Sequence, residues 1–126
     1  MANCNGILIV EDDLIIRETM KELLEMEGYP VFTAQHGKEG IELLKTLSPP
    51  CMILLDLMMP VMNGQEFLKV LRKEASTALC SIPIIVVSAV IDGAKAKELN
   101  VTDYIRKPIN LDKLVSVTKQ YCDAAS

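Results

Sequence analysis

Residues 7–13 read Ile-Leu-Ile-Val-Glu-Asp-Asp, four apolar residues followed directly by three acids. A short continuous apolar run is typical of a parallel strand that is buried on both faces, because helices cover both sides of such a sheet. Residues 51–56, Cys-Met-Ile-Leu-Leu-Asp, repeat the pattern with five apolar residues and one acid. Both stretches therefore predict a buried strand that ends in carboxylate side chains.

Strands and helices alternate outward from these two stretches. Short apolar runs that fit strands occupy residues 7–10, 31–34, 52–55, 84–87 and 104–105. Apolar residues at helical spacing lie before Gly28, before Pro49, after Asn63 and after Asn110. A thinner stripe after Gly93 predicts a short helix over about 94–99. Five βα units predict an α/β fold, a doubly wound five-stranded parallel sheet with helices on both faces.

The composition indicates one globular domain over residues 1–126. Half of the residues are apolar and 24% are charged, close to globular averages. The net charge of −4 argues against direct nucleic-acid binding, which requires a basic surface. The apolar run at residues 7–10 is too short for a signal sequence or a membrane span, so we expect a cytoplasmic protein. Four isolated cysteines, without a CxxC motif or zinc-site spacing, predict free thiols.

Charged or hydroxyl side chains follow four of the five predicted strands. Ligands of open α/β sheets bind beyond the carboxyl ends of the strands, so we expect one site there. Its candidate residues are Glu11, Asp12, Asp56, Ser88 and Lys107. Two carboxylates about 5 Å apart repel by about 3 kcal/mol at an effective dielectric constant of about 20. Three carboxylates and one lysine leave a charge of −2, which a divalent cation balances, and oxygen ligands suit Mg²⁺.

Such a pocket is prepared for an arriving anion, and a phosphoryl group is the natural one. Phosphoryl transfer depends mainly on positioning and on stabilisation of charge. A carboxylate can also be the nucleophile and form an aspartyl phosphate, which makes Asp56 the candidate acceptor.

Several polar residues also have a plain structural explanation. Asp13 can cap the first helix, and Ser88 alone is an ordinary hydroxyl at the end of a strand. Tyr104 fits a half-buried packing role, and His36, without an acid or cysteine partner, fits a surface or capping role. Asp56 is harder to explain in this way, because the apolar run before it holds its carboxylate at a partly dry rim.

The chain resembles the two-component response-regulator receiver domain, the family that includes the single-domain chemotaxis regulators. The resemblance spans nearly the whole chain and implies a flavodoxin-like strand order of 2-1-3-4-5 and a phosphorylation-controlled signalling switch. It rests on four ordered motifs, Ile7-Leu-Ile-Val-Glu-Asp-Asp13, Leu55-Asp-Leu-Met-Met-Pro-Val-Met-Asn-Gly64, Ile84-Ile-Val-Val-Ser-Ala89 and Asp103-Tyr-Ile-Arg-Lys-Pro108.

The resemblance also implies roles for the matched residues. Asp56 would accept a phosphoryl group from a sensor histidine kinase or a phosphotransfer protein, and Lys107 would pair with the phosphoryl oxygens. Asp12 and Asp56 would ligate Mg²⁺ directly, Glu11 would act through a water, and Met58 would lend its backbone carbonyl. Asp13 lies outside the matched acid pair, which leaves capping as its expected role.

The implied output is a shift in conformation. Ser88 would bond the phosphoryl group, the Tyr104 side chain would follow, and the face around the fourth and fifth strands would then control a downstream protein or output domain. A protein of this kind is a phosphoacceptor regulator rather than an enzyme, although it catalyses its own phosphorylation and dephosphorylation. We expect neither nucleic acid nor membrane as a direct partner.

One departure from the family pattern concerns the segment from Ser88 to Tyr104, which is shorter than usual by about one helical turn. The helix there should be short or partly unwound, and we expect residues 90–98 to be mobile in the unphosphorylated protein.

Two other functions stay open at this point. One is a Mg²⁺-dependent phosphatase that forms an aspartyl phosphate, and the other is a receiver-like binding module that never receives phosphate. Such phosphatases commonly place a second acid two residues after the nucleophile, where this chain has Met58. The sequence leaves open whether the domain stands alone or belongs to a longer protein.

Overall fold

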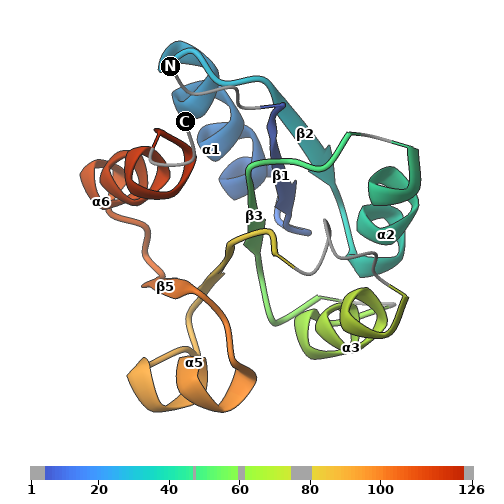
Figure 1. Ribbon diagram of the computed structural model, residues 1–126. Helices are drawn as coiled ribbons and strands as arrows, with labels where there is room; N and C mark the ends of the chain where they lie inside the picture. The colour runs from blue at the N-terminus through green and yellow to red at the C-terminus, as the bar shows by residue number, and fades with distance from the viewer. Residues whose placement is uncertain (1–4, 47, 60–61, 75–80, 124–126) are drawn as a thin grey trace.

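A computed structural model describes residues 5–46, 48–59, 62–74 and 81–123. Its centre is a sheet of five parallel strands in the order β2-β1-β3-β4-β5 (Figure 1). The strands are β1 (Ile7–Val10), β2 (Val31–Ala34), β3 (Met52–Leu55), β4 (Ile84–Ser88) and β5 (Asp103–Arg106). The predicted fold class and strand order are therefore confirmed.

Helices cover both faces of this sheet. Those described are α1 (Leu14–Met26), α2 (Gly37–Thr46), α3 (Gly64–Glu74), α5 (Gly93–Leu99) and α6 (Leu111–Thr118), and a π-helical turn over Lys119–Asp123 continues α6. Helices α1 and α6 pack on one face, and α2 and α3 pack on the other. Figure 1 shows α5 standing apart from the other helices, beside β4 and β5.

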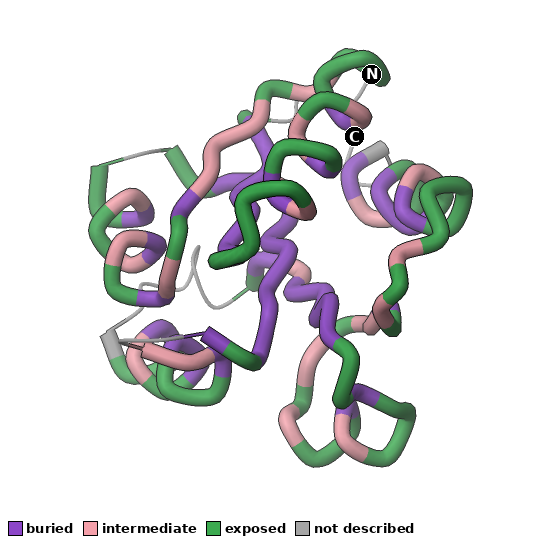
Figure 2. Tube along the Cα trace, turned by 180° about the vertical axis from the view of Figure 1, so that it is seen from behind, coloured by how far each residue is buried: buried purple, intermediate pink, exposed green. Residues whose placement is uncertain are grey.

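Alternating side chains of the strands form the two halves of the core. Ile7 and Ile9 of β1 belong to the half under α1 and α6, whereas Leu8 and Val10 belong to the half under α2 and α3. All four of these side chains have an exposed fraction of 0%. The central strands are accordingly drawn as buried in Figure 2. Because these strands are buried on both faces, their sequences are continuously apolar rather than alternating.

Side-chain caps fix where the helices begin. The backbone N–H of Ile16 donates to Asp13 at the start of α1, at 3.0 Å, so the predicted capping role of Asp13 is confirmed. Asn110 caps α6 in the same way, at 3.1 Å. The N–H of Glu39 donates to Nδ1 of His36 at 3.3 Å at the start of α2, which confirms a capping role for this histidine.

The structure departs from the sequence-based expectations in small ways. β4 and β5 extend into polar residues that the apolar runs excluded, Ser88 and Arg106, because backbone pairing continues past the last apolar side chain. The expectation of free thiols is wrong for Cys51, which is disulfide-bonded and whose Sγ also lies 3.0 Å from Sγ of Cys122. The other two cysteines, at positions 4 and 80, lie outside the described residues.

The expected short helix is present as α5, which has seven residues. Within the parts of the chain that the structure describes, none of the helices has the length and apolar character needed to cross a membrane.

Candidate functional site

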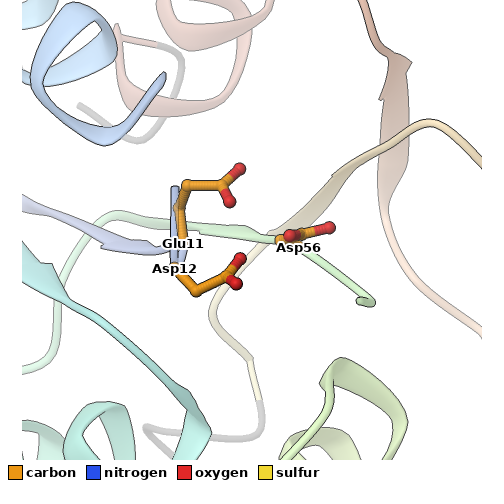
Figure 3. A group of neighbouring side chains, drawn as sticks. All are labelled: Glu11, Asp12 and Asp56. Atoms are coloured by element: carbon orange, nitrogen blue, oxygen red, sulfur yellow. The ribbon is translucent and has the colours of Figure 1, made fainter. Parts of the chain in front are cut away.

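Three carboxylates gather at the carboxyl edge of the sheet. Glu11 and Asp12 follow β1, Asp56 follows β3, and one oxygen of each lies within 4.8 Å of the others. Figure 3 shows these three side chains at the neighbouring strand ends. Glu11 and Asp56 are buried, with exposed fractions of 1% and 4%, whereas Asp12 is exposed. The sequence-based expectation that these acids meet is confirmed in its geometry.

Backbone pairing beyond the strands brings the acids to one level. The N–H of Asp56 donates to the carbonyl of Val10 at 3.0 Å, and the N–H of Glu11 donates to the carbonyl of Ala34 at 3.0 Å. Both acids are therefore held by the same hydrogen-bond ladder that joins β2, β1 and β3. Their separation is set by the spacing of neighbouring strands, about 4.8 Å.

Lys107 supplies the positive charge of the site from the loop that follows β5. Its Nζ lies 2.7 Å from Oε1 of Glu11 and 3.5 Å from Oδ2 of Asp56. The backbone N–H of Lys107 donates to the carbonyl of Ser88 at 3.0 Å, and the Lys107–Pro108 peptide bond is cis. The lysine thus reaches across the end of β4 and contacts both buried acids, Glu11 and Asp56.

Burial and charge shift the pKa values of this group. Burial raises the pKa of Glu11 to about 7, against the lowering effect of its bonds to Lys107 and to the N–H of Asp13. Burial by itself would lower the pKa of Lys107, but the hydrogen bond and the negative charges of Glu11 and Asp56 outweigh it and raise this pKa. Lys107 is therefore a cation at neutral pH, and Glu11 is the acid that resists ionisation.

The donor set fits a hard divalent cation. Oε1 of Glu11 is buried and accepts from the Lys107 ammonium at 2.7 Å, and Oε2 accepts from the N–H of Asp13 at 3.1 Å, so each oxygen keeps one further lone pair. Oδ1 of Asp56 accepts one bond, from the N–H of Met58 at 3.2 Å, and keeps further acceptor capacity. Three clustered carboxylates with spare acceptor sites are the oxygen ligands that Mg²⁺ prefers.

Two other candidate residues lie beside the acids rather than among them. Ser88 ends β4 with a fully buried side chain, whose Oγ accepts from the N–H of Val90 at 3.3 Å. Tyr104 on β5 is half-buried, packs with the small cluster that contains Leu57, and has the ammonium of Lys113 5.6 Å from its ring centroid. Tyr104 thus packs against a cluster that includes Leu57, the residue that follows Asp56 in the chain.

Sequence reasoning missed two residues that shape the site. Arg17 on α1 is buried and bonds to the backbone of both acids that follow β1. It precedes the buried Met20 and Leu24 by three and seven residues, so its place inside the apolar stripe was the available signal. Gly64 packs against the backbone of Asp56; it ends one of the four motifs, but the motif does not show that it contacts the acceptor.

Fold and cluster together define the class of this protein. It is a doubly wound, flavodoxin-like α/β domain with an acidic, lysine-containing pocket at the carboxyl edge of its sheet. A family model, the response regulator receiver domain, matches residues 7–119. The chain therefore belongs to the response-regulator receiver domain family, whose members act as phosphorylation-controlled switches.

Sequence relatives lie among the transcriptional regulatory proteins. CrdR of Helicobacter pylori is 37% identical over 118 residues, which cover 91% of this chain and 54% of that protein. CpxR of Escherichia coli is 39% identical over 115 residues, which cover 89% of this chain and 47% of that protein. The chain spans about half the length of the curated relatives that it matches.

Solved structures of receiver domains have the same architecture. The chemotaxis protein CheY4 of Vibrio cholerae has a TM-score of 0.83 at 27% identity and covers 94% of this chain and 98% of its own. The receiver domain of the Francisella response regulator 1452 has a TM-score of 0.84 at 28% identity and covers 97% and 99%.

Proposed function

We propose that Asp56 accepts a phosphoryl group from the phosphohistidine of a sensor histidine kinase or a phosphotransfer protein. One carboxylate oxygen of Asp56 attacks phosphorus, and an O–P bond forms while the N–P bond to the donor breaks. The electron pair of the broken bond stays on the imidazole, which takes a proton from solvent. We assign the whole of residues 1–126 to this one receiver domain.

The proposal rests on the surroundings of the Asp56 carboxylate. It is buried, it lies 3.5 Å from the ammonium of Lys107, and it lies within 4.8 Å of two further carboxylates. A fixed lysine beside the acceptor can stabilise charge on transferring phosphoryl oxygens without reorganisation of solvent. A purely structural aspartate has no need of a lysine that is shared with a second buried acid.

A magnesium ion completes the proposed site. Asp12, Asp56 and the backbone carbonyl of Met58 would hold it directly, and Glu11 would act through a water. When bound, the ion supplies positive charge that offsets the repulsion between the carboxylates and the incoming phosphoryl group. Lys107 keeps its own contact to the phosphoryl oxygens, because its ammonium faces Asp56 rather than Asp12.

Ser88 and Tyr104 form the proposed output of the switch. The Ser88 hydroxyl is bound to the loop after β4, through the N–H of Val90. A turn of this hydroxyl toward a phosphoryl group on Asp56 would release that bond, and Tyr104 would move into the space it leaves. The phosphorylated protein then populates a second arrangement of the β4–β5 face, which controls a downstream protein or output domain.

Exposed apolar side chains at the edge of the site favour a protein as the donor. Leu14, Ile15 and Met58 have exposed fractions of 60%, 77% and 65%, and they follow the acids closely in the chain. Exposed apolar side chains this near the acids in the chain would suit a protein partner better than a small phosphate ester. It therefore favours a regulator over a phosphatase, in keeping with Met58 at the position where a phosphatase would carry its second acid.

An intact-mass measurement tests the proposal. The chain is incubated with acetyl phosphate and Mg²⁺, and in parallel with acetyl phosphate and EDTA. We expect one added phosphoryl group with Mg²⁺, much less with EDTA, and none for Asp56→Asn. Asp13→Asn is the matched control, because Asp13 is also an acid that closely follows β1 in the chain, but it serves as a helix cap.

The other functions predict different masses. Rapid turnover of small phosphate esters without accumulation would favour a phosphatase. A complete lack of phosphoryl uptake, also with a panel of phosphorylated histidine kinases, would favour a binding module.

A further inference from the structure

Arg17 is a buried cation that the proposed phosphoryl chemistry does not use. It lies on the first turns of α1 with an exposed fraction of 8%. Its Nη1 donates to the backbone carbonyl of Glu11 at 2.9 Å and approaches the backbone carbonyl of Asp12 at 3.4 Å. One guanidinium nitrogen therefore faces the backbone of both acids that follow β1.

No carboxylate in the described part of the chain lies within ion-pair distance of Arg17. A charged group that is buried without a counter-ion is costly unless its surroundings hold it in place. Here the partners are two carbonyls in the turn between β1 and α1. The Arg17 side chain thus donates hydrogen bonds to the backbone of this turn.

We propose that Arg17 is a positioning residue for the cation site, an inference that rests on the proposed function. By bonding the carbonyls of Glu11 and Asp12, it fixes the two peptide units from which their carboxylates project. The exposed Asp12 depends on this most, because its side chain makes no hydrogen bond to any residue that the structure describes. Glu11 has further anchors, the N–H of Asp13 at 3.1 Å and Lys107.

The two physical effects of Arg17 on cation binding have opposite signs. Positioning of the ligands strengthens cation binding. Residues that hydrogen-bond to the ligands of a metal site typically change its affinity by about 10- to 100-fold. The positive charge of the guanidinium weakens binding, because it repels the cation through a medium of low dielectric constant. Replacement of Arg17 by a neutral residue therefore reveals which effect is larger.

Mg²⁺ titration of three variants tests the inference. Arg17→Met removes donors and charge, and Arg17→Lys keeps the charge and some donor capacity. Arg72→Met is the matched control, because Arg72 also donates to a backbone carbonyl, that of Asn100 at 2.8 Å, near the starts of β4 and β5. Since the chain has no tryptophan, binding is followed by titration calorimetry and by backbone amide shifts of residues 10–13.

We expect the dissociation constant of Mg²⁺ to rise by about tenfold in Arg17→Met, by less in Arg17→Lys, and not at all in Arg72→Met. Urea unfolding of each variant shows whether it is folded at the temperature of the titration. If Arg17→Met does not fold, the comparison of Arg17→Lys with Arg72→Met decides in its place.

Three outcomes would overturn the inference. Tighter binding by Arg17→Met would mean that charge repulsion dominates. Unchanged binding in both Arg17 variants would make this arginine a purely structural residue. If the unaltered protein does not bind Mg²⁺, the proposed cation site itself is wrong. If the unaltered protein binds Mg²⁺ and the Arg17 variants bind it with the same affinity, only the role of Arg17 is refuted.

Discussion

The buried Glu11 makes the free energy of unfolding depend on pH. Burial raises its pKa from an ordinary 4.5 to about 7. A folded state with the higher pKa binds the proton more tightly than the unfolded chain, so the stabilisation is present below pH 4.5 and is lost as the pH rises through 7. The loss amounts to about 3 kcal/mol in the metal-free protein.

Urea unfolding in EDTA, at pH 4.5 and at pH 8 around the window of the shift, measures this loss. We expect the free energy of unfolding of the unaltered protein to fall relative to Glu11→Gln between these pH values. The variant is the control, because glutamine does not titrate while the other carboxylates remain. Parallel profiles for the two proteins would show that the pKa of Glu11 is not raised in the folded state.

Helix α3 packs closely against the end of β3 at Gly64. A Cβ atom on Gly64 would lie 2.6 Å from the carbonyl oxygen of Asp56 and 2.7 Å from Cα of Leu57. Both neighbours are backbone atoms and cannot rotate away. We therefore expect Gly64→Ala to lower the free energy of unfolding by about 1–3 kcal/mol and to slow phosphoryl uptake, because the strain acts on the acceptor's own peptide unit.

Gly93→Ala is the matched control for this substitution. Among the described residues, a Cβ there would meet the Tyr104 hydroxyl alone, at 3.7 Å, an ordinary contact distance. Stability is read from urea unfolding, and uptake from the rate of mass change with acetyl phosphate. Equal behaviour of the two alanine variants would show that the approach of α3 to Asp56 does not constrain the site.

Helix α5 is short and depends on its caps. Ala96 is its one buried residue, Asp92 accepts from the N–H of Lys95 at 2.8 Å, and Asn100 ends the helix in a left-handed conformation with φ of 56°. Few buried contacts predict low local stability, so we expect amides of residues 90–98 to exchange faster than those in the middle of α1.

Asp92→Ala should speed exchange in α5 by about fivefold, which corresponds to the loss of one cap of about 1 kcal/mol. Asn110→Ala removes the equivalent cap of α6 and should leave α5 unchanged. Amide exchange followed by NMR or mass spectrometry checks both variants. Strong protection throughout residues 90–98 in the unaltered protein would refute the expected mobility.

The elements themselves were predictable where apolar side chains define them. Three strand ranges agree with the apolar runs because β1, β2 and β3 end where the polar residues begin. The ends of β4 and β5 were not, since Ser88 and Arg106 pair through the backbone alone. The start of α5 was ambiguous because Gly93 is a poor helix former but occupies the first turn, next to the Asp92 cap.

On the scale of the whole molecule, the meeting of Glu11, Asp12 and Asp56 followed from parallel strands alone, since all carboxyl ends share one edge. The order of the strands did not follow from local patterns and was implied only by family resemblance. The contact of Arg17 with the turn after β1 was also hidden, because a charged residue in an apolar stripe does not reveal which backbone groups it bonds. Tertiary pairing of this kind becomes visible only when the fold is known.

Whether the buried Asp56 is the phosphoryl acceptor can be settled by locating the modification in the chain. The chain is treated with acetyl phosphate and Mg²⁺, reduced with borohydride, which converts an acyl phosphate to a primary alcohol, and digested for peptide mass spectrometry. We expect the alcohol at position 56 and nowhere else. Reduction at another acid, or phosphate retained on Ser88 with Asp56 unmodified, would contradict it.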